Sequence, residues 1–411
     1  MPDERRANVL AFPQAPDAIE LRHLRAFVAV AEELNFGRAA DRLHISQSAL
    51  SRQVQGLEQL LGCKLLRRST HRVELTIAGE ALLDRARRLL EDVDEAVSAT
   101  LSIGGELAGR LAQLWAPILS VAGEGSDLHA RREAYEQFHA QFSPPPEVVV
   151  TPVNAGGVPS FRVGAKPDLP PTILYLHGGG YVMGSAFGHK PLIGALAMAA
   201  DATALAPEYR LAPEHPFPAA LEDATRAYQW MLDTGTDPQR IVIAGDSSGA
   251  GLAMSLLLSL KQEAKPLPGG ALLFCPWLDL TGSTLRTLAK EDETAEVLLL
   301  QAIRSVDAYL DGHPIGDPVL NPLRTDLSGL PPMLIQAATR DLQREDAHQL
   351  AERARAHGVD ARLELYPVDT HAFQVFWSFL PEAMEGLSQA GRFARAVGAA
   401  SQNAARRPAT T

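Results

Sequence analysis

Ser247 is the residue of this 411-residue chain whose surroundings are best suited to chemistry. It stands in Gly245-Asp-Ser-Ser-Gly249, which follows the apolar run Ile241–Ala244 and opens a segment of small and aliphatic residues, Gly249–Lys261. Glycines on both sides of a serine permit a sharp strand-to-helix turn, which exposes the hydroxyl near the positive end of the helix dipole. The pattern predicts a nucleophilic serine that attacks an ester carbonyl.

A second motif, His177-Gly-Gly-Gly180, directly follows the predicted strand Ile173–Leu176. Consecutive glycines expose backbone amides, and we expect the amides of Gly178 and Gly179, with that of Ser248, to hold the oxyanion of a tetrahedral intermediate. A plain glycine-rich turn and a phosphate-binding loop are the alternatives. The phosphate loop is disfavoured because no Gly-Lys-Ser/Thr follows.

A serine nucleophile needs a base, and the base needs an orienting acid. If the order along the chain is Ser, then Asp or Glu, then His, both lie after Ser247. Asp341 follows the predicted strand Met333–Ala337, and His371 follows the predicted strand Arg362–Tyr366. Both lie at carboxyl ends of predicted parallel strands, where such sheets place ligands. We therefore predict His371 as the base and Asp341 as the acid for Ser247.

Three other carboxylates lie near these positions. Asp346 and Glu345 remain alternatives for the acid, since they follow the same predicted strand as Asp341. Asp369 is disfavoured because it precedes His371 on one loop and cannot easily reach the far nitrogen of the ring.

Strands and helices alternate around these motifs. Further strands are predicted at Ala202–Ala206 and Ala271–Phe274, and helices at Leu192–Ala200, Ala219–Leu232 and Asp346–His357. Strands that alternate with helices of about ten or more residues predict a mostly parallel sheet covered on both faces, that is, an α/β fold.

Several motifs in this order make residues 125–398 resemble the hormone-sensitive-lipase branch of the α/β-hydrolases. They are His177-Gly-Gly-Gly180, Glu208-Tyr-Arg-Leu-Ala-Pro-Glu-His-Pro-Phe-Pro218, Gly245-Asp-Ser-Ser-Gly249 and His371-Ala-Phe373. The resemblance implies hydrolysis of carboxylic esters with short or medium acyl chains, no cofactor, and a helical cap that combines residues 110–142 with parts of 280–318. Carried over by position, it also implies the roles predicted above for Ser247, His371 and Asp341.

The chain departs from this family pattern at two places. Ser248-Gly249-Ala250 stands where members usually have Ala-Gly-Gly, which keeps the turn but adds a hydroxyl beside the expected oxyanion site. The proline that often follows the acidic residue is absent after Asp341. The choice of Asp341 therefore depends on its place after a strand.

The residues before this segment show a different pattern. Apolar residues at helical spacing predict a first helix from Leu21 to Asn35, a second over Gly37–Leu43, and a third that Ser46 caps and Gly62 ends. The alternation in Lys64–Leu75 then predicts a two-stranded wing.

Thr76 is predicted to cap a long helix with an apolar stripe from Leu82 to Val97. Gly104, Gly105 and Gly109 interrupt that pattern, which predicts a domain boundary near residues 104–110. The predicted organisation is a flexible tail over 1–19, a winged helix-turn-helix over 20–78, a linker helix over 79–104, a hydrolase domain over 110–400 and a flexible tail over 401–411.

Residues 20–104 resemble the DNA-binding and linker segments of LysR-type regulators. The resemblance is carried by Leu21-Arg-His-Leu-Arg-Ala-Phe27, Asn35-Phe-Gly-Arg-Ala-Ala40, Ser46-Gln-Ser-Ala-Leu-Ser-Arg52, Leu57-Glu58 and Thr76-Ile-Ala-Gly79. It implies a homodimer paired through the linker helix. After Gly105 the usual effector domain of that family is replaced by the hydrolase.

Polar residues at the start of the third helix suit the base edges and phosphates of double-stranded DNA, and arginines in the wing suit backbone phosphates. The predicted contacts are Gln47, Ser48, Ser51 and Arg52 from the helix and Arg67, Arg68 and Arg72 from the wing. The alternative is that these side chains only solvate an amphipathic helix.

The charge distribution fits two parts. The net charge is −11, while residues 20–80 hold nine Lys/Arg against seven Asp/Glu. A basic segment beside an acidic body favours a polyanion-binding part joined to one that avoids polyanions. Cys63 and Cys275 lie far apart, which argues against a disulfide framework and a cysteine zinc site. No apolar run approaches the ~18 to 20 residues of a membrane helix, so a soluble, cytoplasmic protein is expected.

The sequence leaves three functional hypotheses open. The first is an active esterase tethered to a DNA-binding dimer. The second is a transcription regulator whose hydrolase fold senses an ester with little turnover, and the third keeps the amino-terminal module only for dimerisation. The intact serine, histidine and glycine motifs favour the first, because a sensor has no need to retain them.

Overall fold

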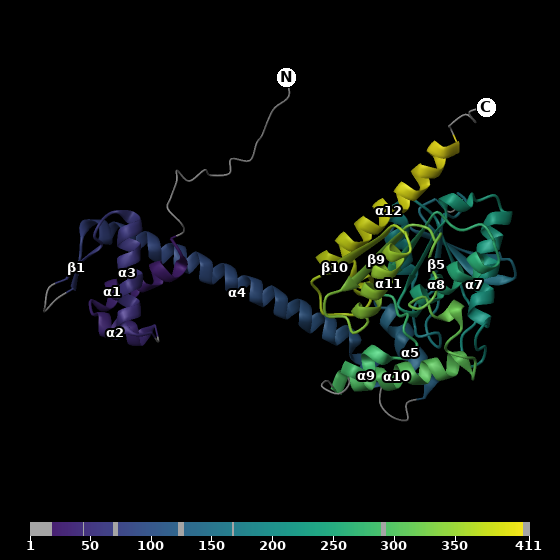
Figure 1. Ribbon diagram of the computed structural model, residues 1–411, viewed down its shortest axis with the longest axis horizontal. Helices are drawn as coiled ribbons and strands as arrows, with labels where there is room; N and C mark the ends of the chain where they lie inside the picture. Colours follow the sequence, from purple (N-terminus) through teal and green to yellow (C-terminus); the bar gives the residue numbers. More distant parts are fainter. Residues whose placement is uncertain are drawn as a thin grey trace, which may run out of the picture. The chain divides into compact units, whose positions relative to one another are not determined.

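The structure, a computed structural model, describes residues 19–43, 45–68, 73–121, 127–166, 168–288 and 293–405. Its contacts divide the chain into two compact units, Met1–Gly109 and Arg110–Thr411 (Figure 1). Most of the predicted N-terminal tail, residues 1–18, lies outside the described residues, as do residues 406–411.

The first unit combines short helices with a small antiparallel sheet. Its elements are α1 (Leu21–Glu33), α2 (Phe36–Arg42), α3 (Gln47–Leu61), β1 (Leu66–Arg68), β2 (Val73–Leu75) and the start of α4 (Ile77–Ser120). As predicted, Ser46 Oγ caps α3 by accepting a hydrogen bond from the Ala49 amide at 3.2 Å, and α3 ends at Gly62. Phe27, Leu50 and Val54 are fully buried in its core. The helix-turn-helix is confirmed, and β1 and β2 form the wing.

The long helix α4 is longer than the linker helix predicted over 79–104. It continues through Gly104, Gly105 and Gly109 and ends at Ser120. An interior glycine costs a helix only about 1 kcal/mol relative to alanine, which packing can offset. Here Leu111 and Leu114, from the last turns of α4, pack against the core of the second unit.

The second unit is built on an eight-stranded sheet with the order β10-β9-β8-β7-β5-β6-β4-β3. Its strands are β3 (Val149–Ala155), β4 (Val158–Gly164), β5 (Ile173–Leu176), β6 (Ala204–Pro207), β7 (Val242–Asp246), β8 (Gly270–Phe274), β9 (Met333–Ala338) and β10 (Ala361–Tyr366). From β10 to β6 every pairing is parallel, whereas β3 and β4 pair antiparallel at the edge. The α/β class with a mostly parallel sheet is confirmed.

Helices cover both faces of this sheet. One face packs against α7 (Ala219–Asp233), α8 (Ser248–Gln262) and α11 (Arg344–Ala356), and the other against α6 (Lys190–Ala200) and α12 (Pro381–Ala405). The central strands read as continuous apolar runs because they are buried on both sides. Residues 401–405 belong to α12, so the tail predicted from 401 begins with helical residues.

The remaining elements come from the segments expected to form a cap and from short connections. They are α5 (Leu128–His139), α9 (Ser283–Leu288), α10 (Glu293–Leu310) and the 3-10 helices η1 (Pro238–Arg240), η2 (Pro318–Leu320) and η3 (Phe373–Phe376). Figure 1 shows α9 and α10 at one end of the second unit. Tyr309 of α10 stacks on Tyr181 after β5, with ring centroids 3.9 Å apart. Within the described residues, no helix is long and apolar enough to cross a bilayer, and Cys63 and Cys275 are free thiols.

Candidate active site

Ser247 occupies the tight connection between β7 and α8. Its backbone has φ 53° and ψ −122°, a strained combination for a residue with a side chain. The turn is held by its own backbone, because the Ser247 amide donates to the Phe274 carbonyl at 2.9 Å and its carbonyl accepts from the Trp277 amide at 3.1 Å. A side chain on Gly249 would collide with the Leu176 carbonyl of β5. The glycine is thus required for helix and strand to approach this closely.

His371 and Asp341 meet at the ends of two neighbouring parallel strands. His371 Nδ1 lies 2.8 Å from Asp341 Oδ2, and Asp341 is buried at 8% exposure. Burial alone would lower the pKa of His371, but the charge and hydrogen bond of Asp341 outweigh it and raise the pKa, with a further contribution from Asp246. His371 Nε2 is buried and has no hydrogen-bond partner among the described residues. The Asp341 carboxylate therefore holds the ring through Nδ1, and Nε2 is left free to act as a base.

The structure distinguishes Asp341 from the alternative acids. Asp346 accepts hydrogen bonds of 2.7 and 2.8 Å from two backbone amides, and burial raises its pKa to about 6. Asp369 lies 3.6 Å from Arg340, and Glu345 bonds to a glutamine on its own helix at 3.1 Å. Among these carboxylates, the bond to His371 belongs to Asp341.

The glycine-rich loop after β5 differs from the prediction at one amide. The Gly178 amide donates to Asp246 Oδ1 at 3.0 Å, so it is already engaged and does not fit the oxyanion role predicted for it. The amides of Gly179 and Ser248 have no acceptor among the described residues. Gly179 takes φ 122°, a conformation that favours glycine. The next amide, of Gly180, donates to Ser248 Oγ at 2.8 Å.

Asp246 anchors this loop from beneath. Its buried carboxylate also accepts from the Tyr175 hydroxyl at 2.8 Å, and His189 Nε2 lies 3.7 Å away. Burial would raise the pKa of Asp246, but His189 and the Tyr175 hydrogen bond lower it to about 2. The carboxylate is therefore charged at neutral pH and can hold the Gly178 amide firmly.

His177, the first residue of the loop, is a structural anchor and remains neutral. Burial lowers its pKa to about 3, with the neighbouring His189 adding to the effect. Its ring stacks on Tyr209 at 4.2 Å, and the Tyr209 hydroxyl donates to the His177 carbonyl at 2.6 Å. The contacts with Tyr209 therefore fix the first residue of the loop.

Cys275 joins the site although the sequence analysis assigned it no function. Its Sγ, a carboxylate oxygen of Asp341 and a ring nitrogen of His371 all lie within 4.8 Å of one another. Burial raises the pKa of the thiol, and the Asp341 charge raises it further, so the thiol stays protonated. Cys275 directly follows β8, so the strand-end rule that selected Asp341 could have found it.

Residues 173–375 match the family model described as the alpha/beta hydrolase fold. An acetyl-hydrolase from Streptomyces hygroscopicus is 37% identical over 276 residues, which cover 66% of this chain and 90% of that protein. An esterase from Acinetobacter venetianus is 35% identical over 272 residues, which cover 66% of this chain and 89% of the esterase.

This chain belongs to the α/β-hydrolase family. A solved structure of an esterase from the bacterial hormone-sensitive lipase family superimposes with a TM-score of 0.65 at 35% identity, covering 70% of this chain and 98% of that one. The resemblance that the sequence motifs indicated is thus confirmed, as is the enzyme class, carboxylic ester hydrolase, at the level of the family. Residues 21–80 match the bacterial regulatory helix-turn-helix model of the lysR family, which confirms the second resemblance.

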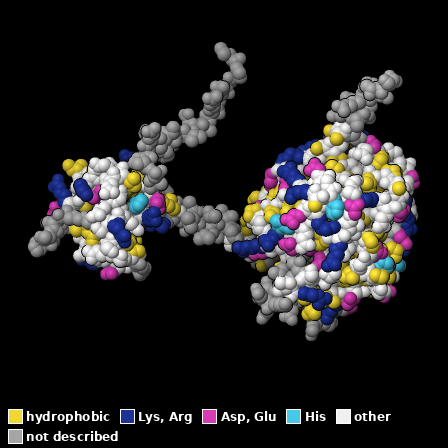
Figure 2. Space-filling model, viewed as in Figure 1, with side chains coloured by type: hydrophobic (Ala, Val, Ile, Leu, Met, Phe, Trp, Pro, Cys, Tyr) yellow, Lys and Arg dark blue, Asp and Glu magenta, His cyan; other side chains and the backbone are white. Residues whose placement is uncertain are grey.

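In this α/β-hydrolase the predicted DNA-contacting residues cluster at the start of α3 and in the wing. Gln47, Ser48 and Arg52 are exposed, and Arg52 Nε lies 3.4 Å from the Ser48 carbonyl. Ser51 is half-buried. Figure 2 shows Lys and Arg side chains on the visible face of this unit, interspersed with acidic and apolar ones.

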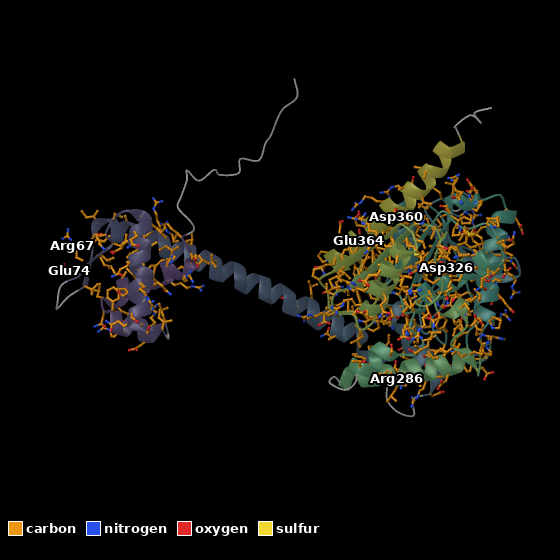
Figure 3. All side chains as sticks on the ribbon, viewed as in Figure 1. Arg67, Glu74, Arg286, Asp326, Asp360 and Glu364 are labelled. Carbon is orange, nitrogen blue, oxygen red and sulfur yellow. The ribbon has the colours of Figure 1, made fainter. Side chains whose placement is uncertain are left out.

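The wing carries the other predicted contacts. Exposed Arg67 of β1 lies opposite Glu74 of β2 (Figure 3). Arg68 belongs to β1, and Arg72 lies outside the described residues. Burial would raise the pKa of Glu58, but hydrogen bonds from Lys64 and two wing amides lower it, so a charged carboxylate ties the wing to α3.

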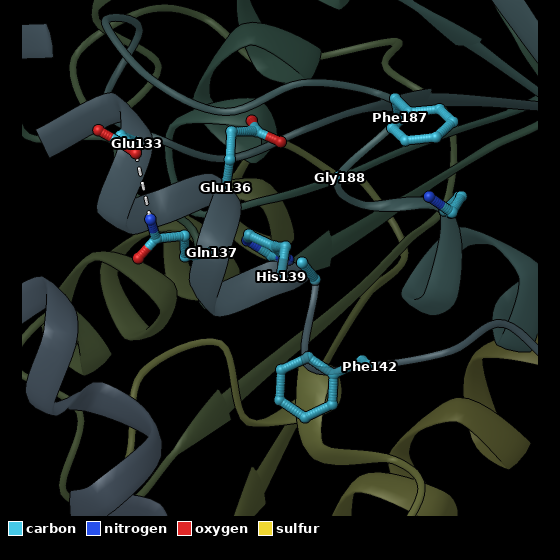
Figure 4. A pocket seen from close by; sticks show the side chains of 9 residues that line it. Glu133, Glu136, Gln137, His139, Phe142, Phe187 and Gly188 are labelled. Atoms are coloured by element: carbon cyan, nitrogen blue, oxygen red, sulfur yellow. Dashed lines mark hydrogen bonds between the residues drawn. The ribbon is translucent and has the colours of Figure 1, made fainter. Parts of the chain in front are cut away.

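A cavity of about 390 Å³ lies between α5 and the segment before α6 (Figure 4). Glu133, Glu136, Phe187 and Lys190 are among the residues that line it, and the Lys190 ammonium lies 3.3 Å from the centroid of the Phe187 ring. None of Ser247, Asp341 or His371 lines it. The cavity is therefore separate from the residues predicted to react.

Proposed function

We propose that this protein is a serine carboxylesterase for short to medium acyl esters, with Ser247 as nucleophile, His371 as base and Asp341 as acid. The observation that carries the proposal is the 2.8 Å bond between His371 and Asp341, which leaves His371 Nε2 buried and unpartnered. The contact between Ser247 Oγ and Nε2 is not formed in this structure. Such contacts often tighten only when substrate is bound.

The chemistry follows from this arrangement. His371 Nε2 takes the Ser247 proton as Oγ forms a bond to the ester carbonyl carbon, and the carbonyl electron pair moves onto oxygen. The amides of Gly179 and Ser248 hold that oxyanion. Collapse breaks the bond to the alcohol, which leaves with the proton from His371. Water then repeats both steps, which releases the acid and restores Ser247.

The test is hydrolysis of p-nitrophenyl acetate and butyrate by the wild type and by Ser247→Ala. We expect the variant to lose about 10⁴- to 10⁶-fold in kcat. Ser255→Ala is the matched control, because Ser255 is a buried serine on the same helix, two turns further along, and should retain full activity. Equal rates for the wild type and Ser247→Ala would contradict the proposal and favour the sensor hypothesis.

We further propose that the amino-terminal unit binds double-stranded DNA, which would place the protein in the cytoplasm. Other arginines of this unit are engaged with carboxylates: Arg38 pairs with Glu33 at 3.1 Å, and Arg42 pairs with Glu32 at 2.7 Å. Arg52, by contrast, is exposed at the start of α3 and makes no ion pair with a described residue. Its charge is thus available to a phosphate or a base edge.

Binding to random duplex DNA should weaken steeply with salt. Arg52→Ala should lower the affinity and the salt slope, whereas Arg38→Ala, which removes a charge already paired, should change both much less. Absence of binding at low salt would leave dimerisation as the role of this unit.

The third part of the proposal is a homodimer paired through α4. Leu89, on the predicted apolar stripe, is 46% exposed in the single chain, so its side chain is accessible to a partner helix. Sedimentation equilibrium should give twice the chain mass of 44.2 kDa, and Leu89→Asp should shift the protein towards monomer. A monomeric wild type at micromolar concentration would contradict the dimer.

A further inference from the structure

The last turns of α4 belong to the hydrolase core. Leu111, Leu114 and Ile118 pack against the apolar cluster that covers the α6 and α12 face of the sheet. The Arg110 guanidinium lies 3.8 Å above the ring of Phe379. These contacts hold the end of α4 beside the segment that follows His371.

Trp115 connects this helix end to the histidine loop itself. Its ring stacks on Phe138 of α5, with centroids 4.6 Å apart, and meets the edge of Phe376, five residues after His371, at 6.1 Å. Its indole Nε1–H donates to Thr370 Oγ1 at 2.8 Å. Thr370 is the residue before His371 and is buried at 8% exposure.

The hydrogen bonds continue from Thr370 to the histidine. Thr370 Oγ1, which accepts the indole N–H, lies 3.5 Å from the His371 carbonyl and can donate its proton there. Beyond His371 the chain turns sharply, since Ala372 takes the left-handed conformation with φ 48°. The backbone on both sides of the ring is thus fixed by local contacts, and one of these comes from α4.

We propose that Trp115 is a positioning residue, which through Thr370 holds the backbone of His371 so that the ring can bond to Asp341 and face Ser247. The proposal rests on the catalytic role proposed above for His371. It makes the final turns of α4, the helix that also enters the helix-turn-helix unit, part of the support of the reacting groups. Catalytic groups must be held to within a fraction of an ångström, and misplacement by about 1 Å can cost about 100-fold in rate.

Trp115→Phe tests this, because it removes the indole N–H and keeps an aromatic ring against Phe138. We expect kcat on p-nitrophenyl butyrate to fall by about 10- to 100-fold with KM little changed. The matched control is Trp377→Phe in the same region, since the Trp377 indole N–H is buried with no partner among the described residues. That control should keep wild-type kcat.

Substitutions at Thr370 test the acceptor. Thr370→Val, which has nearly the same shape but no hydroxyl, should reproduce the loss, and Thr370→Ser should restore activity. The double variant with Trp115→Phe should be no slower than Thr370→Val alone, because Thr370→Val already removes the bond that Trp115→Phe removes. Additive losses would overturn the proposal.

The pH profile separates positioning from simple destabilisation. His371 faces Asp341 and, at longer range, Asp246, and these charges keep its pKa raised. A ring that drifts from Asp341 loses part of that effect, so the acid limb of kcat in Trp115→Phe should move to lower pH. A lower Tm with an unmoved limb and unchanged kcat would overturn the positioning role. If the wild type itself were no faster than Ser247→Ala, the proposed esterase function would fail instead.

Discussion

Two loops flank Ser247, and they are supported in different ways. The glycine-rich loop after β5 is tied to the sheet by Asp246, which is charged, buried and bonded to the Gly178 amide and the Tyr175 hydroxyl. Its partners all come from the sheet and the segments next to it. The histidine loop after β10 is held by one bond to Asp341 and by contacts from α4.

The difference separates two tasks of the site. The oxyanion donors are backbone amides, so fixing them requires a rigid main chain, and a buried ionic anchor provides one. The base is a side chain that must exchange protons with Ser247, and its loop is held by the Asp341 carboxylate, a neutral hydrogen bond from Trp115 and aromatic packing. We expect substitutions at the first loop to act on stability as well as rate, and those at the second mainly on rate.

The largest effect should come from breaking the support of the base. Asp341→Asn should lower kcat by about 10⁴-fold, because the imidazole loses its tautomer control and its counter-charge. The Asp341 carboxylate raises the pKa of His371, and activity requires the neutral ring. The acid limb of residual activity should therefore move to lower pH in the variant.

The companion variant is Asp346→Asn, at the alternative acid. It removes a carboxylate bonded only to backbone amides within the described residues, so kcat should change far less than in Asp341→Asn. A larger loss in Asp346→Asn, measured on the same p-nitrophenyl esters, would show that the acid had been assigned wrongly.

Much of this site could be predicted because each reacting residue follows a buried strand. Apolar runs located the strands, and chain order then gave Ser247, Asp341 and His371 as candidates, which the sheet places at the ends of β7, β9 and β10. The caps at Ser46 and Gly62 were equally readable, because they depend on local backbone chemistry alone.

Other features depend on contacts between distant segments, which sequence spacing does not show. The Gly178 amide turned out to be engaged because Asp246, 68 residues later, lies beneath it. The end of α4 was placed too early, because glycine propensity was visible and the packing of Leu111 and Leu114 was not. The part played by Trp115 could not be read at all, since its partner Thr370 lies 255 residues away.

An intermediate effect is expected at the anchor of the glycine-rich loop. The folded pKa of Asp246 is about 2, below the ordinary 3.8, so its ionisation stabilises the fold above about pH 4 and that contribution is lost as pH falls towards 2. The shift corresponds to about 2 kcal/mol. Asp246→Asn should therefore lower the free energy of unfolding by roughly that amount at pH 7.

Urea unfolding of both proteins from pH 7 to pH 2 checks this. Histidines also contribute, because burial would lower the pKa of His189 but Asp246 raises it in the wild type. The difference between the curves therefore reports the Asp246–His189 pair at higher pH and the Asp246 carboxyl itself below about pH 4. That difference should shrink as pH falls below 4. A constant difference across the range would mean that the lower free energy of unfolding of Asp246→Asn does not depend on the carboxylate charge. The glycine-rich loop would then not be held by an ionic anchor.

The smallest effect concerns the hydroxyl at the family-atypical Ser248. Its Oγ accepts a hydrogen bond from the Gly180 amide at 2.8 Å. Gly180 directly follows Gly179, the proposed oxyanion donor, but its own amide is occupied by this bond. Ser248→Ala leaves the Gly180 amide free to act as a further oxyanion donor, so kcat should rise. We expect a rise of about 2- to 10-fold, which is smaller than the effect of a fully aligned oxyanion donor. The lost hydrogen bond should cost about 1 kcal/mol in stability.

Ser248→Thr, which keeps the hydroxyl, should behave like the wild type. A fall in kcat in Ser248→Ala with Ser248→Thr unaffected would mean that the hydroxyl itself donates to the oxyanion. The oxyanion would then be held by a side chain as well as by backbone amides, and the contrast with the histidine loop would be weaker.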